Sequence, residues 1–149
     1  MKVFPLMLMC TLVVAGSNSF ACDQLMKKTL LYVGVQAGVN KGVVTTNPAH
    51  LNGTTKKIGY TVDDSCALPE ADYSEVLVGT TEGRNEGVVS PDVNHAGGST
   101  SSIGYLSKKP IAGGEKLYVG SASCNKGVVT DNAMHLGCAT TFIGYAMPL

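Results

Sequence analysis

One motif occurs three times along the chain, and this repetition limits the folds that the sequence can adopt. The copies span residues 31–62, 76–107 and 117–147. Each runs from a Val-Gly pair through Asn-[Lys/Glu]-Gly-Val-Val and a histidine to Ile-Gly-Tyr. In every copy the histidine lies eight residues after the glycine of Gly-Val-Val and eight residues before the isoleucine. Copies that align without a gap over this stretch indicate three tandem units of one supersecondary element.

The apolar segments within each copy are short and are bounded by Gly, Asn and Pro. In the first copy they cover residues 31–33, 43–45 and 57–62. These lengths, the β-branched residues and the lack of a helical period predict strands of about four to six residues joined by tight turns. Residues 23–30 fit either one or two capped helical turns or an edge strand.

The expected fold is therefore all-β, with three pseudo-repeats of short antiparallel strands. Closure about a pseudo-threefold axis, as in a β-trefoil or a three-sheet β-prism, removes edge strands that would otherwise pair with other chains. A linear stack is the alternative, but no copy looks like a polar terminal cap. Val, Ile, Leu and Tyr must form the core, because residues 22–149 contain no Trp and only one Phe, Phe142.

The first 21 residues have the pattern of a secretory signal peptide. Lys2 precedes an apolar stretch, and small residues, Ser19 and Ala21, stand three and one positions before the expected cleavage site. A bacterial lipoprotein start is the alternative, because Cys22 follows this site, but Ser19 stands where a branched apolar residue is usual. The sequence thus predicts a secreted, extracellular protein whose residues 22–149 form a single domain of 128 residues.

Four cysteines remain after removal of the leader, and an even number in an oxidising compartment predicts two disulfides. Cys124 and Cys138 both lie in the third copy, at the positions of Val39 and Gly53 in the first. Two cysteines at partnered positions of one copy indicate that those positions are in contact in every copy, so we expect Cys124 to pair with Cys138. Cys22 would then pair with Cys66. Without a Cys-x-x-Cys pair, a metal site is a weak alternative.

Charge excludes some partners but identifies none. Residues 22–149 keep ten of the eleven Lys and Arg against eleven acids, with no basic stripe. Nucleic acid and anionic membranes are therefore poor candidates, and no membrane anchor is expected. Asn52-Gly53-Thr54 is an N-glycosylation sequon, which indicates an exposed loop and a glycoprotein if the chain is a eukaryotic secreted one.

The repeated histidine loop is the candidate ligand site. An amide or acid precedes each histidine by three residues, and such side chains in one loop can bind a hydroxylated ligand. The six candidate residues are His50, His95, His135, Asn47, Asp92 and Asn132. Two alternatives remain: the histidine bonds to the backbone of its own copy while the Asx starts the turn, or three imidazoles hold zinc on the threefold axis.

Two other repeated positions are expected to be structural. The Asn of Asn-x-Gly, at positions 40, 85 and 125, suits a turn in which the side chain bonds to its own backbone and the glycine takes a positive φ. The Tyr of Ile-Gly-Tyr, at 60, 105 and 145, suits half-buried core. Nothing resembles a catalytic set, so neither an enzyme nor a cofactor is expected.

Several short strings resemble the DM9 repeat of invertebrate secreted and cytosolic proteins. They are Tyr-Val-Gly at 32–34, Leu-Tyr-Val-Gly-Ser-Ala at 117–122 and Tyr-Ser-Glu-Val-Leu at 73–77, together with the later Ile-Gly-Tyr segments. The resemblance covers about half of each copy, and no binding residue is carried over from it. It implies a β fold and, for some members, mannose recognition in innate immunity.

The sequence as a whole favours a secreted, non-enzymatic, lectin-like protein that binds glycans, in innate defence or in a secreted fluid. Threefold repetition of a polar loop on a disulfide-bonded β scaffold is the basis of this expectation, since a lectin gains avidity from several weak sites. The alternatives are a structural or matrix protein whose repeats only build the fold, and a protease inhibitor that presents the longer linker at residues 61–75.

Overall fold

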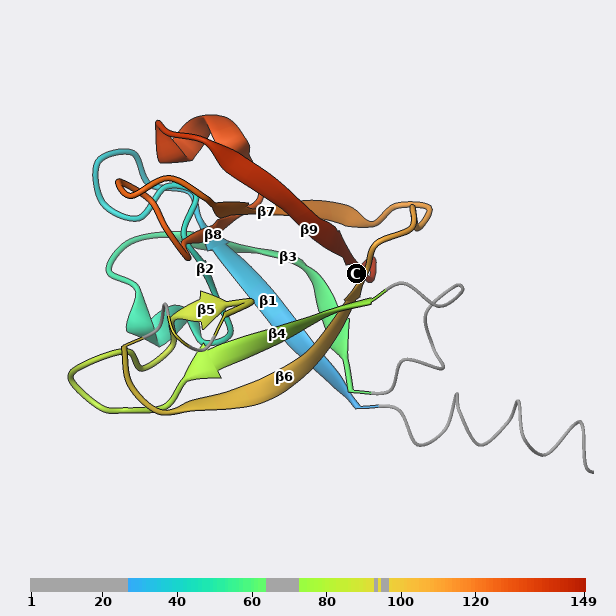
Figure 1. The fold of residues 1–149 in the computed structure, drawn as a ribbon, viewed down its shortest axis with the longest axis horizontal. Coiled ribbons are helices and arrows are strands. Elements are labelled where there is room, and N and C mark those ends of the chain that lie inside the picture. The colour runs from blue at the N-terminus through green and yellow to red at the C-terminus, as the bar shows by residue number, and fades with distance from the viewer. Residues whose placement is uncertain (1–26, 64–72, 93, 95–96) are drawn as a thin grey trace, which may run out of the picture.

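The computed structural model describes residues 27–63, 73–92, 94 and 97–149, and within them the protein is all-β (Figure 1). The strands belong to one antiparallel sheet. The helical segments with described bounds are the short 3-10 turns η1 (Pro48–His50) and η3 (Ala133–Leu136), and Asn94 is also helical. The nine strands are β1 (Lys28–Gly34), β2 (Val44–Thr45), β3 (Thr55–Val62), β4 (Tyr73–Gly79), β5 (Val89–Ser90), β6 (Thr100–Ser107), β7 (Glu115–Gly120), β8 (Val129–Thr130) and β9 (Thr140–Ala146).

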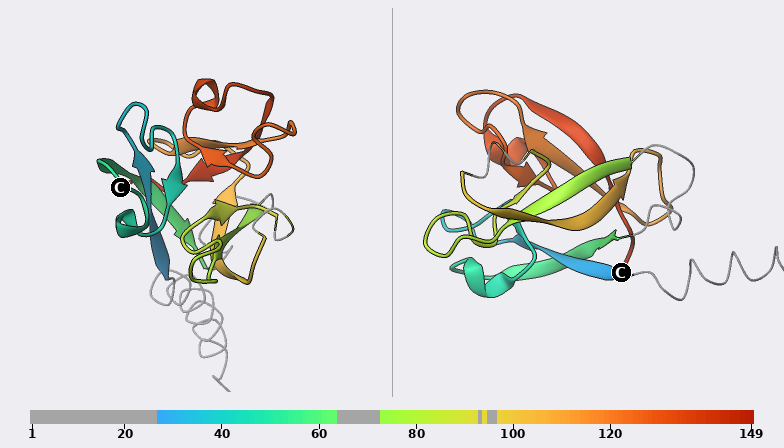
Figure 2. Two further views of the ribbon diagram at one scale, coloured as in Figure 1. Left: turned by 90° about the vertical axis from the view of Figure 1, so that its left-hand side faces the viewer. Right: turned by 60° about the horizontal axis from the view of Figure 1, so that its bottom comes forward.

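The strands group into three units that follow the three sequence copies. The first unit pairs β1 with β2 and β3, the second pairs β4 with β5 and β6, and the third pairs β7 with β8 and β9. In each unit the first long strand pairs with the second long strand along one edge and with a short two-residue strand along its opposite edge. The three units lie against one another around a shared core (Figure 2).

A bulge opposite the first long strand explains the Ile-Gly-Tyr motif. In the first unit Leu31 pairs with Gly59 and Tyr32 with Lys57, so Ile58 is the extra residue on β3. The register shifts between the corresponding residues of β4 and β7. Gly59 has φ +150°, and a Cβ placed there would lie 3.0 Å from the Cβ of Ala146 in the third unit. The glycine is therefore required where a neighbouring unit approaches the bulged strand.

Single bridges connect the long strands of different units. Val62 of β3 pairs with Tyr105 of β6, and Ser107 of β6 pairs with Tyr145 of β9. An isolated bridge joins Tyr60 of β3 to Met147 just after β9, with N to O distances of 2.9 and 2.8 Å. Backbone bonding is thus extensive within each unit and sparse between units, so the shared core must supply most of the attraction between them.

That core is made of aliphatic residues from all three units. Its buried members are Leu31, Val33, Val44, Ile58, Val76, Val89, Leu106, Leu117, Val129, Ile143 and Ala146. The tyrosines of Ile-Gly-Tyr are half-buried, as expected, but they are not among these buried members. The only phenylalanine of this part of the chain, Phe142, is 39% exposed. The core is accordingly lean in aromatic area and depends on Leu, Val and Ile.

The asparagine of Asn-x-Gly is a turn residue, but its bonding partners differ from the expected ones. Asn40 is 4% exposed, accepts from the backbone N–H of Gln36 at 3.0 Å and donates to the carbonyl of Thr54 at 3.0 Å. Asn85 and Asn125 bond in the same way. The side chain therefore links the turn to the segment leading into the third strand of its unit rather than to its own backbone. The following glycines have positive φ, as predicted.

Other expectations about local structure have mixed outcomes. Residues 28–30 belong to β1, so the helical alternative is wrong there and the strand alternative is correct, although β1 as a whole lies between β2 and β3 in the sheet. Residues 1–26 and 64–72 lie outside the described part, and with them the expected leader, Cys22, Cys66 and most of the 61–75 linker. Among the described residues, no helix is long and apolar enough to cross a membrane.

Candidate functional site

The amides that precede His50 and His135 cap the turns that carry them, and Asp92 makes the corresponding backbone hydrogen bond in the second unit. Asn47 accepts from the backbone N–H of Ala49 at 3.0 Å, and Asn132 accepts from that of Met134 at 3.0 Å. Asp92 accepts from the N–H of Asn94 at 2.9 Å. One side-chain oxygen at each of these positions is therefore engaged by the turn, as the structural alternative expects of the Asx.

The two described histidines, His50 and His135, lie against a neighbouring unit. A Cβ at Gly87 of the second unit would lie 2.8 Å from Cγ of His50, whose side chain is 31% exposed. His50 Nε2 also lies 3.7 Å from a carboxylate oxygen of Glu86. A Cβ at Gly42 of the first unit would lie 2.9 Å from Nδ1 of His135 in the third unit. Each of these two imidazoles therefore lies at a junction between units. Neither the ligand-site expectation nor the scaffold expectation predicted a contact with another unit.

His95, the third histidine of the expected ligand site, lies outside the described residues. His50 and His135 lie against different units, at separate junctions. Among the described residues, no group of three His, Cys, Asp or Glu side chains could hold a metal ion.

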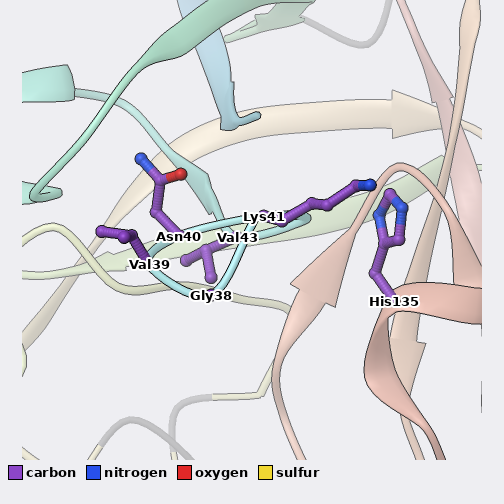
Figure 3. Close-up of a pocket in the computed structure, with 6 residues that line it drawn as sticks. All are labelled: Gly38, Val39, Asn40, Lys41, Val43 and His135. Carbon is purple, nitrogen blue, oxygen red and sulfur yellow. The ribbon is translucent and has the colours of Figure 1, made fainter. Parts of the chain in front are cut away.

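A polar cleft of about 290 Å³ lies at the junction of the third and first units. It is lined by the turn from Gly38 to Lys41, by Val43 and by His135. Figure 3 shows the Lys41 side chain running toward the His135 ring, whereas Asn40 points away from it. An ammonium and an imidazole from two units therefore face the same space.

A second cleft, of about 360 Å³, lies at the junction of the second and third units. Its lining includes Pro91 and Asp92 from the histidine loop of the second unit, with Ser121 and Lys126 from the third. Lys126 occupies the same motif position as Lys41, the variable residue of Asn-[Lys/Glu]-Gly. Both clefts thus place the histidine loop of one unit beside the Asn-[Lys/Glu]-Gly turn of the next.

Sequence reasoning missed the variable residue of that turn. Lys41, Glu86 and Lys126 were treated as turn residues, yet each lines a cavity at a junction. Asp131 was missed as well: its Oδ1 is buried without a hydrogen-bond partner, directly before Asn132. For Lys41, Glu86 and Lys126 the sequence did contain a signal. Theirs is the only charged position in the otherwise uniform motif Asn-x-Gly-Val-Val, and its charge changes sign between copies.

The disulfide predicted within the third unit is present. Cys124 and Cys138 are bonded, with their Cα atoms 6.6 Å apart. In the first unit, a Cβ at Gly53 would lie 3.1 Å from Cγ1 of Val39, so the corresponding positions are also adjacent there. The contact between these two positions is therefore common to both units. Asn52, the acceptor of the sequon, is exposed in the loop that follows η1.

The two clefts offer hydrogen-bond donors and acceptors within small volumes. An ammonium, a carboxylate or imidazole, and backbone groups can hydrogen-bond several hydroxyls of one small ligand. Comparison with known proteins adds no assignment, since no family model, no curated protein and no solved structure matches the chain.

Proposed function

We propose that this protein is a secreted, non-enzymatic carbohydrate-binding protein with weak sites at the junctions between its units. The observation that carries the proposal is the pair of similar clefts, of about 290 and 360 Å³, each built from the histidine loop of one unit and the turn of the next. Cavities of this size suit one sugar ring. The DM9-like motifs favour the same class of ligand.

The proposal includes closure of the three units about a pseudo-threefold axis. Bridges between β3 and β6, between β6 and β9, and between Tyr60 and Met147 link each unit to the other two. The packing of His50 on Gly87 and of His135 on Gly42 is the same contact at two junctions. A closed arrangement makes the junctions equivalent, so that one glycan surface can engage several weak sites at once and gain avidity.

The cleft lysines provide the sharpest test. We expect the purified chain to bind a subset of sugars on a glycan array, and Lys126→Met and Lys41→Met to lower avidity at least tenfold by removing an ammonium donor while keeping the aliphatic stem. Lys108→Met is the matched control, because Lys108 is exposed and lines neither cleft. Silence across neutral and acidic sugars, or an equal effect of Lys108→Met, would overturn the proposal.

A structural or matrix role is the second candidate. It is favoured by the capping bonds of Asn47, Asp92 and Asn132, which give the repeated polar residues a scaffold role. Under this alternative His135→Ala lowers the melting temperature while the array stays silent. Under the carbohydrate proposal, in contrast, Lys126→Met leaves the melting temperature unchanged and lowers only sugar binding. The inhibitor alternative rests on the 61–75 linker, and no described contact favours it.

A further inference from the structure

A third cavity differs from the two clefts described above, because its lining is mostly valine. It has a volume of about 320 Å³ and is bounded by the Gly-Val-Val segments of all three units. The valines are Val43, Val44, Val88, Val89, Val128 and Val129. The second valine of each pair is 2% exposed and belongs to the core, so it forms the floor. The first valine of each pair forms the rim.

Two of the rim valines are well exposed to solvent. Val88 is 45% exposed and Val128 is 36% exposed, although both are β-branched residues next to strands. Binding of an apolar molecule there is favourable, because it removes these valine side chains from water. An apolar cavity of about 150 Å³ is known to hold benzene, so this one can accept a body of one or two rings.

A carboxylate and an imidazole lie at the edge of this cavity. Glu86 and His50 both line it, and their nearest oxygen and nitrogen are 3.7 Å apart, beyond ordinary hydrogen-bond distance. Both side chains are partly exposed, at 45% and 31%. The Glu86 carboxylate can therefore accept a hydrogen bond from the polar end of a ligand whose apolar body rests on the valines.

From this arrangement we infer that the valine-lined cavity binds a small apolar amine, with a body of one or two rings and a single ammonium group. The carboxylate selects a cation over an anion by charge, and the valines select an apolar body over a sugar. This site uses neither Lys41 nor Lys126, and of its lining residues only Val43 also lines one of the proposed glycan clefts.

The test is a titration of the purified chain followed through the methyl signals of its valines by NMR. The probes are 1-naphthylmethylamine, the neutral 1-naphthalenemethanol and the anionic 1-naphthaleneacetate. We expect saturable shifts with the amine, binding of the alcohol at least fivefold weaker, and the weakest binding for the anion. Glu86→Gln should weaken the amine at least fivefold and leave the alcohol unchanged. Glu82→Gln, an exposed carboxylate of the same loop outside the cavity, should change neither.

Substitutions of the rim valines test whether the probes bind in this cavity. A Val88→Thr and Val128→Thr double variant should weaken amine and alcohol alike by at least fivefold, whereas Val35→Thr, an exposed valine outside the cavity, should have no effect. Thermal unfolding of each variant shows that it is folded. The absence of saturable binding by any probe overturns the site, and unchanged binding by the rim variant overturns its location. Equal effects of Glu86→Gln and Glu82→Gln overturn the preference for an amine.

Discussion

Replacing Gly87 with alanine tests whether the histidine of the first unit is packed tightly against the second. Gly87 has φ +80°, and an added Cβ would lie 2.8 Å from Cγ and 2.9 Å from Cβ of His50. Gly83 lies in the same loop, has φ +73°, and has nothing within 4 Å of an added Cβ. The two substitutions therefore share the same backbone strain and differ only in the contact with the imidazole.

The expected losses in the free energy of unfolding follow from the backbone strain and the contact with the imidazole. Alanine in the left-handed region costs about 1 kcal/mol, so Gly83→Ala should lower the free energy of unfolding by about that much. Forcing a methyl group into an occupied contact adds about 2 kcal/mol. Gly87→Ala should therefore cost about 3 kcal/mol, which corresponds to a fall in Tm of about 10 °C for a domain of this size.

A double variant separates strain from contact. Gly87→Ala combined with His50→Ala should recover about 2 kcal/mol relative to the sum of the two single variants, because the added methyl then occupies the space of the imidazole. Urea and thermal unfolding, followed by circular dichroism, measure the wild type, the three single variants and the double variant. If Gly87→Ala costs no more than Gly83→Ala, or if His50→Ala gives no recovery, the packing across this junction is refuted. Gly42 and His135, with Gly38 as control, allow the same experiment at another junction.

Two further predictions concern the loops within a unit. Asn85→Ala should lower the free energy of unfolding in urea by about 3 kcal/mol, because it leaves the N–H of Thr81 and the carbonyl of Ser99 without a partner. Asn94→Ala, in an exposed position, should cost less than about 0.5 kcal/mol. Equal costs would contradict the assignment of Asn85 as a buried bonding residue. Arg84→Cys with Gly98→Cys should form a disulfide like that of the third unit and raise stability by up to about 3 kcal/mol. Peptide mapping without reductant detects the bond, and two free thiols after oxidation would show that the second unit lacks this geometry.

The elements of each unit could be predicted from sequence because their causes are local. Short β-branched segments between Gly and Asn led to strands at 31–33, 43–45 and 57–62, and the structure has β1, β2 and β3 there with slightly different ends. The Cys124 to Cys138 disulfide was also predictable, because two substitutions at matched positions of one copy report a contact. Trefoil-like or prism-like closure, secretion and sugar binding stay predictions.

The junctions could not be predicted, because they depend on how the units are placed in space. The spacing within a copy located His50 beside Asn47 along the chain, but it carried no information that the imidazole would rest on Gly87 of the next unit. The charged residue of Asn-[Lys/Glu]-Gly was likewise assigned to a turn. Its side chain matters only once a second unit supplies the other wall of the cleft.

Both ends of the described chain lie beside the same strand, β3. Lys28, at the start of β1, pairs with Val62, and Met147 bridges to Tyr60. A short linker could therefore join the end of β9 to the start of β1, and new ends could be opened between β6 and β7, where residues 108–114 take part in no strand pair. Such a circular permutant would keep every strand pair and both described histidine contacts. The order in which the gene encodes the three units is thus independent of the way in which they pack.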